Sequence, residues 1–184
     1  MSLIGHNRGP TMAEGHSWRK YCWAEARRAL LPTLPLEVVR LRVARARAIG
    51  LDYKTYATVR ASTGQDIVAF LFSSNALRLF APAPHLPPDR AARLASIEAC
   101  DRLAAIHRPL SAEQIQIPGI DTAFAAPHPF AIWREVRAIL RAALSVRGLA
   151  PEGVLVIGDA GAEQDWPATA ALAGYLPADR FFAG

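Results

Sequence analysis

The sequence predicts an α/β fold: a small, open and mostly parallel sheet with flanking helices, preceded by a helical N-terminal segment. From residue 66 onward, short apolar runs of strand length alternate with stretches of helical periodicity, and this order is typical of a parallel sheet with helices on its faces. Before residue 65 only helical patterns occur. The expected organisation is a flexible arm over 1–16, a helical segment over 17–64 and a Rossmann-like domain over 65–184.

The helical segment is predicted to contain three helices. A stripe of apolar residues indicates a helix over 36–49, which Gly50 is suited to end. Asp52 is a good N-cap for the next helix, over 52–62. A further helix over 18–31 precedes both of them.

The Rossmann-like domain is predicted to alternate five strands with three helices. The run from Asp66 to Phe72 is continuously apolar after its first residue, as expected of a strand that is buried on both faces. The other predicted strands cover 103–107, 122–126, 153–157 and 180–182. The predicted helices cover 89–100, 129–147 and 166–174. The stripe expected along the longest of these helices is Phe130, Trp133, Val136, Leu140 and Leu144.

Composition excludes several classes of protein. About half of the 184 residues are apolar and a fifth are charged, which is ordinary for a globular protein. No apolar run approaches the length that spans a bilayer, so we expect a cytoplasmic protein of bacterial type with no membrane contact.

Cys22 and Cys100 are expected to be buried free thiols. The net charge of +5 lies in the front of the chain, where residues 1–64 hold eleven Lys and Arg against four Asp and Glu. A basic front indicates an anionic partner.

Polar side chains follow two of the predicted strands. The first group is Ser73, Ser74 and Asn75, and the second is Asp159, Glu163 and Asp165. Because ligands bind outside the carboxyl ends of parallel strands, we expect both groups at one edge of the sheet. The first group suits a phosphate, and the carboxylates suit Mg²⁺, which commonly bridges to phosphate. His107 ends another strand and is expected to be a hydrogen-bonded histidine, with proton transfer into a cleft as the alternative.

Residues 66–182 resemble the haloacid dehalogenase-like (HAD) phosphatases. The stretch Gly158-Asp159-Ala-Gly-Ala-Glu163 has the spacing of their Gly-Asp-x-x-x-Asp metal segment, and the ending Ala-Asp-Arg-Phe-Phe is common among them. Ser73 or Ser74 is similar to their phosphate-binding hydroxyl, and Pro127-His-Pro129 to their Lys-Pro-x-Pro step. The resemblance implies a site for Mg²⁺ and phosphate at the carboxyl edge of the sheet.

The chain lacks two of the catalytic features of that family. The family has an upstream strand that ends in Asp-x-Asp, whose first Asp is the nucleophile, and no such strand end occurs here. The family also uses a lysine to hold the phosphate charge, whereas Lys20 and Lys54 both lie in the helical segment. We therefore assign no catalytic residue and expect a non-catalytic binding or regulatory protein on a degenerate HAD-like scaffold. Its helical segment would dock on a partner protein or a second copy of the chain. A Mg²⁺-dependent phosphatase with an atypical nucleophile is one alternative.

The other alternative is a DNA-binding regulator. Residues 36–61 have the spacing of a helix-turn-helix, with a turn at Gly50. Basic and hydroxyl side chains on both helices would meet phosphates and base edges. The residues expected to make those contacts are Arg42, Arg45, Lys54, Thr55, Thr58 and Arg60.

Overall fold

The computed structural model describes residues 34–81 and 84–183. The chain divides into two compact units, Met1–Val39 and Arg40–Gly184, and every described strand belongs to the second. The predicted arm over 1–16 and the predicted helix over 18–31 lie outside the described residues.

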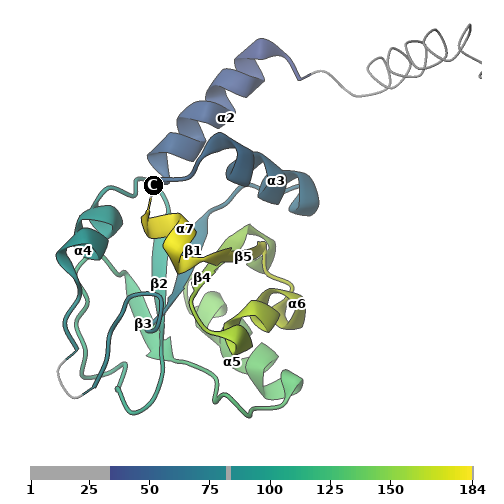
Figure 1. Ribbon diagram of the computed structural model, residues 1–184. Coiled ribbons are helices and arrows are strands. Elements are labelled where there is room, and N and C mark those ends of the chain that lie inside the picture. The colour runs from purple at the N-terminus through teal and green to yellow at the C-terminus, as the bar shows by residue number, and fades with distance from the viewer. Residues whose placement is uncertain (1–33, 82–83, 184) are drawn as a thin grey trace, which may run out of the picture. The chain divides into compact units, whose positions relative to one another are not determined.

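A five-stranded sheet forms the centre of the second unit. Its strands are β1 (Ala69–Ser73), β2 (Asp101–Ile106), β3 (Thr122–Ala125), β4 (Val154–Gly158) and β5 (Gly174–Pro177). They lie in the order β3-β2-β1-β4-β5, and every neighbouring pair is parallel (Figure 1). The predicted α/β class, with an open parallel sheet that follows a helical segment, is confirmed.

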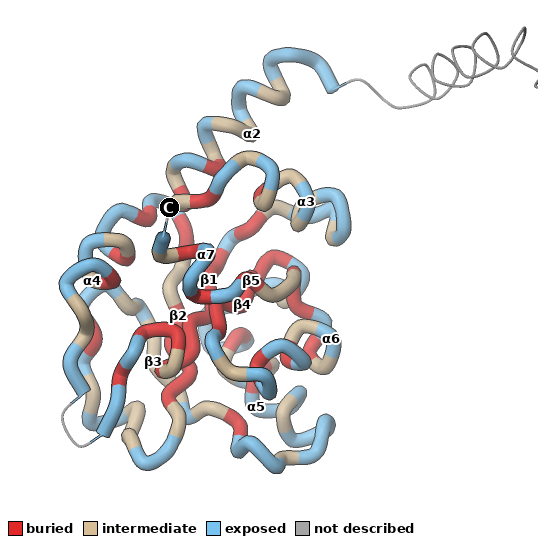
Figure 2. The backbone as a smooth tube through the Cα atoms, in the orientation of Figure 1, coloured by how far each residue is buried: buried red, intermediate tan, exposed pale blue. Residues whose placement is uncertain are grey.

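Helices cover both faces of this sheet. Alternate residues of β1 point to opposite faces, so Phe70 and Phe72 belong to one apolar cluster and Ala69 and Leu71 to the other. The first cluster includes residues of α2 (Leu36–Ala48), α3 (Tyr53–Thr63), α4 (Pro88–Ala95) and α7 (Ala178–Phe182). The second includes residues of α5 (Trp133–Val146) and α6 (Trp166–Ala170). The strands consequently form the buried centre of Figure 2.

Local capping explains why the helical segment agrees with its prediction. The Asp52 carboxylate accepts the N–H of Thr55 at 2.9 Å, which makes it the N-cap of α3. Gly64 ends the same helix in the left-handed region with φ of 72°, a conformation that glycine adopts without steric cost. The two helices over 36–49 and 52–62 are therefore confirmed to within one residue at each end.

The C-terminal elements correct the prediction. The helix expected over 166–174 ends at Ala170, because Ala171 takes a left-handed conformation with φ of 54°. Residues 174–177 form β5, and the strand expected over 180–182 is wrong because those residues belong to α7. Phe181 in α7 packs its ring 5.1 Å from that of Phe70, so an apolar pair that suggested a strand is the buried side of a short helix.

Smaller corrections concern α5 and the ends of other elements. The helix expected over 129–147 begins at Trp133, and Phe130 and Trp133 are 91% and 63% exposed. Of the expected apolar stripe, Val136 is half-buried and only Leu140 and Leu144 are buried. The first strand begins at Ala69 rather than at residue 66. The helix expected over 89–100 covers Pro88–Ala95.

Cys100 lies directly before β2 and is a buried free thiol, as predicted. Burial raises the pKa of this thiol to about 12, so it has little of the thiolate character that reactivity requires. Among the described helices, none combines the length and the apolar character that crossing a membrane requires.

Candidate functional site

The strand order places a topological switch point between β1 and β4. The connection from β1 to β2 runs through α4 on one face of the sheet, whereas the connection from β3 to β4 runs through α5 on the other. The chain therefore leaves the carboxyl ends of β1 and β4 in opposite directions and opens a crevice between them, where ligands of such folds bind. Ser73, at the end of β1, and Gly158, at the end of β4, both lie at this crevice.

The side chain of Glu163 occupies the crevice. Glu163 lies in the 3-10 helix η2 (Gly161–Asp165) and is fully buried. Its Oε2 accepts hydrogen bonds from the Ser73 hydroxyl at 2.8 Å and from the backbone N–H groups of Asp159 at 2.7 Å and Ala160 at 3.1 Å. Its Oε1 accepts one from the Asn75 amide at 2.8 Å. We call these groups the four-donor cluster, and together they satisfy a carboxylate that is almost entirely removed from water.

His107 lies beside this carboxylate, at the end of β2. Its Nε2 is 3.6 Å from Glu163 Oε1, and its Nδ1 is 3.0 Å from the Ser74 hydroxyl. That hydroxyl also accepts the backbone N–H of His107, at 3.1 Å, so two contacts join Ser74 to this histidine. Burial lowers the pKa of His107 below its usual range, against the opposing charge of Glu163. His107 is therefore a hydrogen-bonded histidine, as the sequence predicted.

A pocket of about 290 Å³ opens beside the crevice. Asn75, His107 and Glu163 form one part of its wall, and Asp165 and Trp166 of the segment after β4 form another. Ala160, Ala162 and Thr169 of the segment after β4 also line it, and the loop after β3 and the start of α5 contribute Pro127, His128, Pro129, Ala131, Trp133 and Val136. The pocket thus joins the buried polar groups of the crevice to an apolar and aromatic surface.

Gly158 is needed where β4 meets this site. A Cβ atom at this position would lie 2.5 Å from the ring of Tyr175 and 2.6 Å from Glu163 Oε2. These contacts are closer than atoms approach, so any side chain would push Glu163 away from its donors. Glycine at residue 158 is thus a requirement of the carboxylate's position and not only of a strand-to-loop turn.

We expect Gly158→Ala to lower the free energy of unfolding by about 2–3 kcal/mol, as overpacking of a buried site does. Gly161→Ala is the matched control, because nothing lies within 4 Å of the added Cβ. Urea denaturation followed by circular dichroism measures both variants. Equal stability of Gly158→Ala and the wild type would show that Glu163 does not hold the described position.

The structure separates the carboxylates predicted to bind Mg²⁺. Glu163 is buried, whereas Asp159 and Asp165 are exposed. Over residues 34–81 and 84–183, no group of three or more His, Cys, Asp or Glu side chains is arranged to hold a metal ion. Magnesium at these acids stays a prediction from the sequence. The three residues predicted to bind phosphate, Ser73, Ser74 and Asn75, do lie together at the crevice. Their polar atoms, however, bond to Glu163 and His107.

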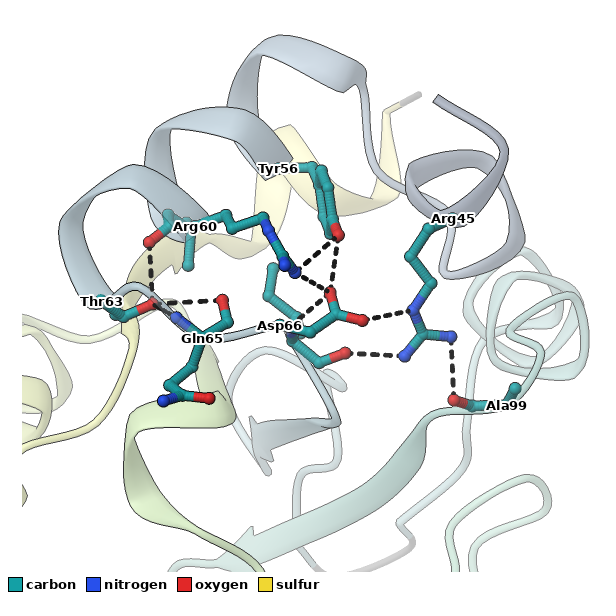
Figure 3. A network of polar contacts seen from close by, with 9 residues as sticks. Arg45, Tyr56, Arg60, Thr63, Gln65, Asp66 and Ala99 are labelled. Carbon is teal, nitrogen blue, oxygen red and sulfur yellow. Dashed lines mark hydrogen bonds and ion pairs between the residues drawn. The ribbon is translucent and has the colours of Figure 1, made fainter. Parts of the chain in front are cut away.

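The helices predicted to bind DNA are tied to the sheet through Asp66 (Figure 3). Its carboxylate accepts hydrogen bonds from Arg45 Nε at 3.2 Å and from the Tyr56 hydroxyl at 2.7 Å, and Arg60 Nη1 lies 3.5 Å away. Arg45 also donates to the carbonyl oxygens of Ile67 and Ala99, which precede β1 and β2. The end of α2 and the helix α3 are therefore held at the amino end of the strands, away from the switch point.

This network uses two of the residues expected to contact DNA. Arg45 and Arg60 are both bonded within the chain. Thr58 donates its hydroxyl to the Lys54 carbonyl, and Thr55 accepts a hydrogen bond from Arg180. Arg42 and Lys54 form no ion pair with a described residue. DNA binding stays a prediction, and two of the residues expected to make it, Arg45 and Arg60, have a structural role.

Sequence reasoning missed three features of the site. Trp166 stacks on His107 with ring centroids 5.8 Å apart, and Tyr175 packs over Gly158. The third missed feature is that the Glu163 side chain points inward, toward the ends of β1 and β4. The spacing of Glu163 from Ala160 was an available signal, because a Glu at the third position of a helix commonly reaches back to the first N–H groups.

The geometry defines a Rossmann-like α/β unit with a switch-point pocket whose carboxylate is internal. No family model, no curated protein and no solved structure matches the chain.

Proposed function

We propose that this chain is a non-catalytic binding or regulatory protein on a degenerate HAD-like scaffold, and that its ligand site is the pocket beside the switch point. The observation that carries the proposal is the burial of Glu163 in the four-donor cluster. Backbone N–H groups and hydroxyls at the ends of parallel strands are the groups that would hold a phosphate. Here the protein's own carboxylate takes those hydrogen bonds.

Two features argue against chemistry on a bound substrate. A hydroxyl nucleophile must reach the substrate and must be activated by a base. The Ser73 and Ser74 side chains belong to residues that are 0% and 1% exposed, and both hydroxyls already bond to neighbouring groups. His107 does contact the Ser74 hydroxyl, but Ser74 is buried, so a substrate cannot reach this oxygen.

In a regulatory role, the helical segment would be the part that docks on a partner protein or a second copy. Leu41 in α2 is 71% exposed, so this large apolar side chain is available to a partner. The amino end of the strands would then carry the partner, and the carboxyl end the ligand.

A turnover assay tests the proposal against the phosphatase alternative. We expect p-nitrophenyl phosphate with Mg²⁺ to release no phosphate above the buffer rate, in the wild type and in Asp159→Asn alike. Small fragments that bind should shift the amide signals of Asn75 and His107 and be recovered unchanged. Mg²⁺-dependent phosphate release that Asp159→Asn abolishes would contradict the proposal and establish an enzyme.

A further inference from the structure

The outer side of α5 carries a second row of apolar side chains, separate from the row that packs on the sheet. The inner row contains the buried residues Leu140 and Leu144. The outer row is Ile132, Ile139 and Val146, which are 60%, 36% and 78% exposed. They follow one another at intervals of seven residues, about two turns of helix, so they form one line along the solvent side of α5 (Figure 2).

The positions between these residues complete the pattern of a helix that pairs with another helix. Residues 132, 135, 139, 142 and 146 are separated by alternating intervals of three and four, which is the spacing of a two-helix seam. Glu135 and Ala142 occupy the two intermediate positions, and both are exposed. Ala138, beside them, is also exposed, and small side chains let two helices approach closely. We call these six residues the outer seam of α5.

The arginines of this region do not reach the outer seam. Arg141 donates to a backbone carbonyl of α6 at 2.7 Å, and Arg147 bonds to a carboxylate at the start of β2 at 3.0 Å. The Arg134 guanidinium lies over the Trp133 ring, 5.9 Å from its centroid. Arg137 is two residues from both Glu135 and Ile139, which places it on the opposite side of the helix. A second copy at the seam would therefore not bring two basic faces together.

The exposed apolar area is large enough for a weak dimer. Of the ten large apolar side chains that are exposed among residues 34–81 and 84–183, five lie between residues 130 and 146. Phe130, which is 91% exposed, and the outer row together present roughly 450 Å² of apolar surface. Covering this surface in two copies would bury about 900–1,000 Å², which is the size of a weak but specific interface.

The single charge in the outer seam selects the orientation of the pair. In a parallel pair, Glu135 of one copy would face Glu135 of the other, and like charges at a seam are unfavourable. In an antiparallel pair centred between Ile139 and Ala142, Glu135 faces Val146 of the second copy instead, and Ile139 faces the small Ala142. Each contact then occurs twice, as the two-fold symmetry of a dimer requires.

We infer that two copies of this chain form a dimer through the outer seam, with their α5 helices antiparallel. The inference does not depend on the proposed function. It assigns the second copy to α5 and leaves the helical segment to a different partner protein.

Sedimentation of the full chain at about 2–200 µM tests the inference, and the wild type is expected to dimerise with a dissociation constant of roughly tens of micromolar. Val146→Glu brings a carboxylate to Glu135 of the second copy and should raise that constant about tenfold or more. Val146→Lys brings an opposite charge there and should dimerise about tenfold more tightly than Val146→Glu. In a Glu135→Lys background the order of the two variants should reverse.

Residue 146 is exposed, so circular dichroism should show that these variants are folded as the wild type is. The control is Leu41→Glu, which places a charge on an exposed leucine of α2 and should leave the dissociation constant within about twofold.

Three results would overturn the inference. One is a wild-type chain that is monomeric over the whole concentration range. Another is equal weakening by Val146→Glu and Val146→Lys in both backgrounds, since Glu135 would then not face residue 146. The third is a dimer that survives Val146→Glu but is lost in Leu41→Glu, which would place the second copy on α2.

Discussion

Glu163→Ala is expected to lower the free energy of unfolding by about 3–5 kcal/mol, the largest effect of any single substitution at the site. The change leaves the donors of Ser73, Asn75, Asp159 and Ala160 without their acceptor. Buried donors that lose a partner carry the full cost of their desolvation. Urea denaturation of the full chain, followed by circular dichroism, measures the loss.

Two further variants make that result specific. Glu163→Gln keeps the shape and one acceptor oxygen but turns an NH₂ group toward donors, so an intermediate loss is expected. Glu113→Ala removes an exposed glutamate from a loop and should change stability by less than about 0.5 kcal/mol. A loss below about 1 kcal/mol for Glu163→Ala would mean that the carboxylate does not hold the two strand ends together.

Asp66→Ala, outside the pocket, is expected to lower the free energy of unfolding by about 2–3 kcal/mol. Asp66 joins α2, α3 and the start of β1 through Arg45, Tyr56 and Arg60 (Figure 3). Its side chain is 37% exposed, so water screens part of the ion pairing and the loss is smaller than at Glu163. Chemical denaturation of single and double variants with Arg45→Ala gives the coupling between the two residues.

The matched control for Asp66 is Asp179→Ala. Asp179 is 79% exposed and lies 4.0 Å from Arg78, and ion pairs on the surface contribute about 0–1 kcal/mol. If the two aspartate variants lost equal stability, or if the coupling between Asp66 and Arg45 were zero, the network would not be what holds the helices to the sheet.

The parts of the fold that local signals specify could be predicted from the sequence. The apolar run of β1 has no polar alternation, since both of its faces are covered. Asp52 and Gly64 mark the ends of α3 because their own backbone and side-chain geometry performs the capping. Alternation of strands and helices then limits the topology to an open parallel sheet.

The rest depends on contacts between distant residues. Ser73 and Asn75 meet Glu163 across 90 and 88 positions of the chain, so no local pattern indicates that the carboxylate points inward. The prediction placed a strand at residues 180–182 because they are apolar enough for one. Only the packing of Phe181 on Phe70 selects the helix there. The sequence thus predicted that Ser73, Ser74, Asn75 and Glu163 lie at one edge of the sheet. It did not predict the hydrogen bonds among them.

The central claim is that Glu163 takes the place of an anion at the switch point. It is tested most directly by titrating inorganic phosphate into the ¹⁵N-labelled wild-type chain and following the amide protons of Asp159 and Ala160, which donate to Glu163. The account predicts that neither signal shows a saturable shift, because the carboxylate already holds both donors. Saturable shifts of both signals, at a common dissociation constant, would contradict it and show that the crevice is open to phosphate.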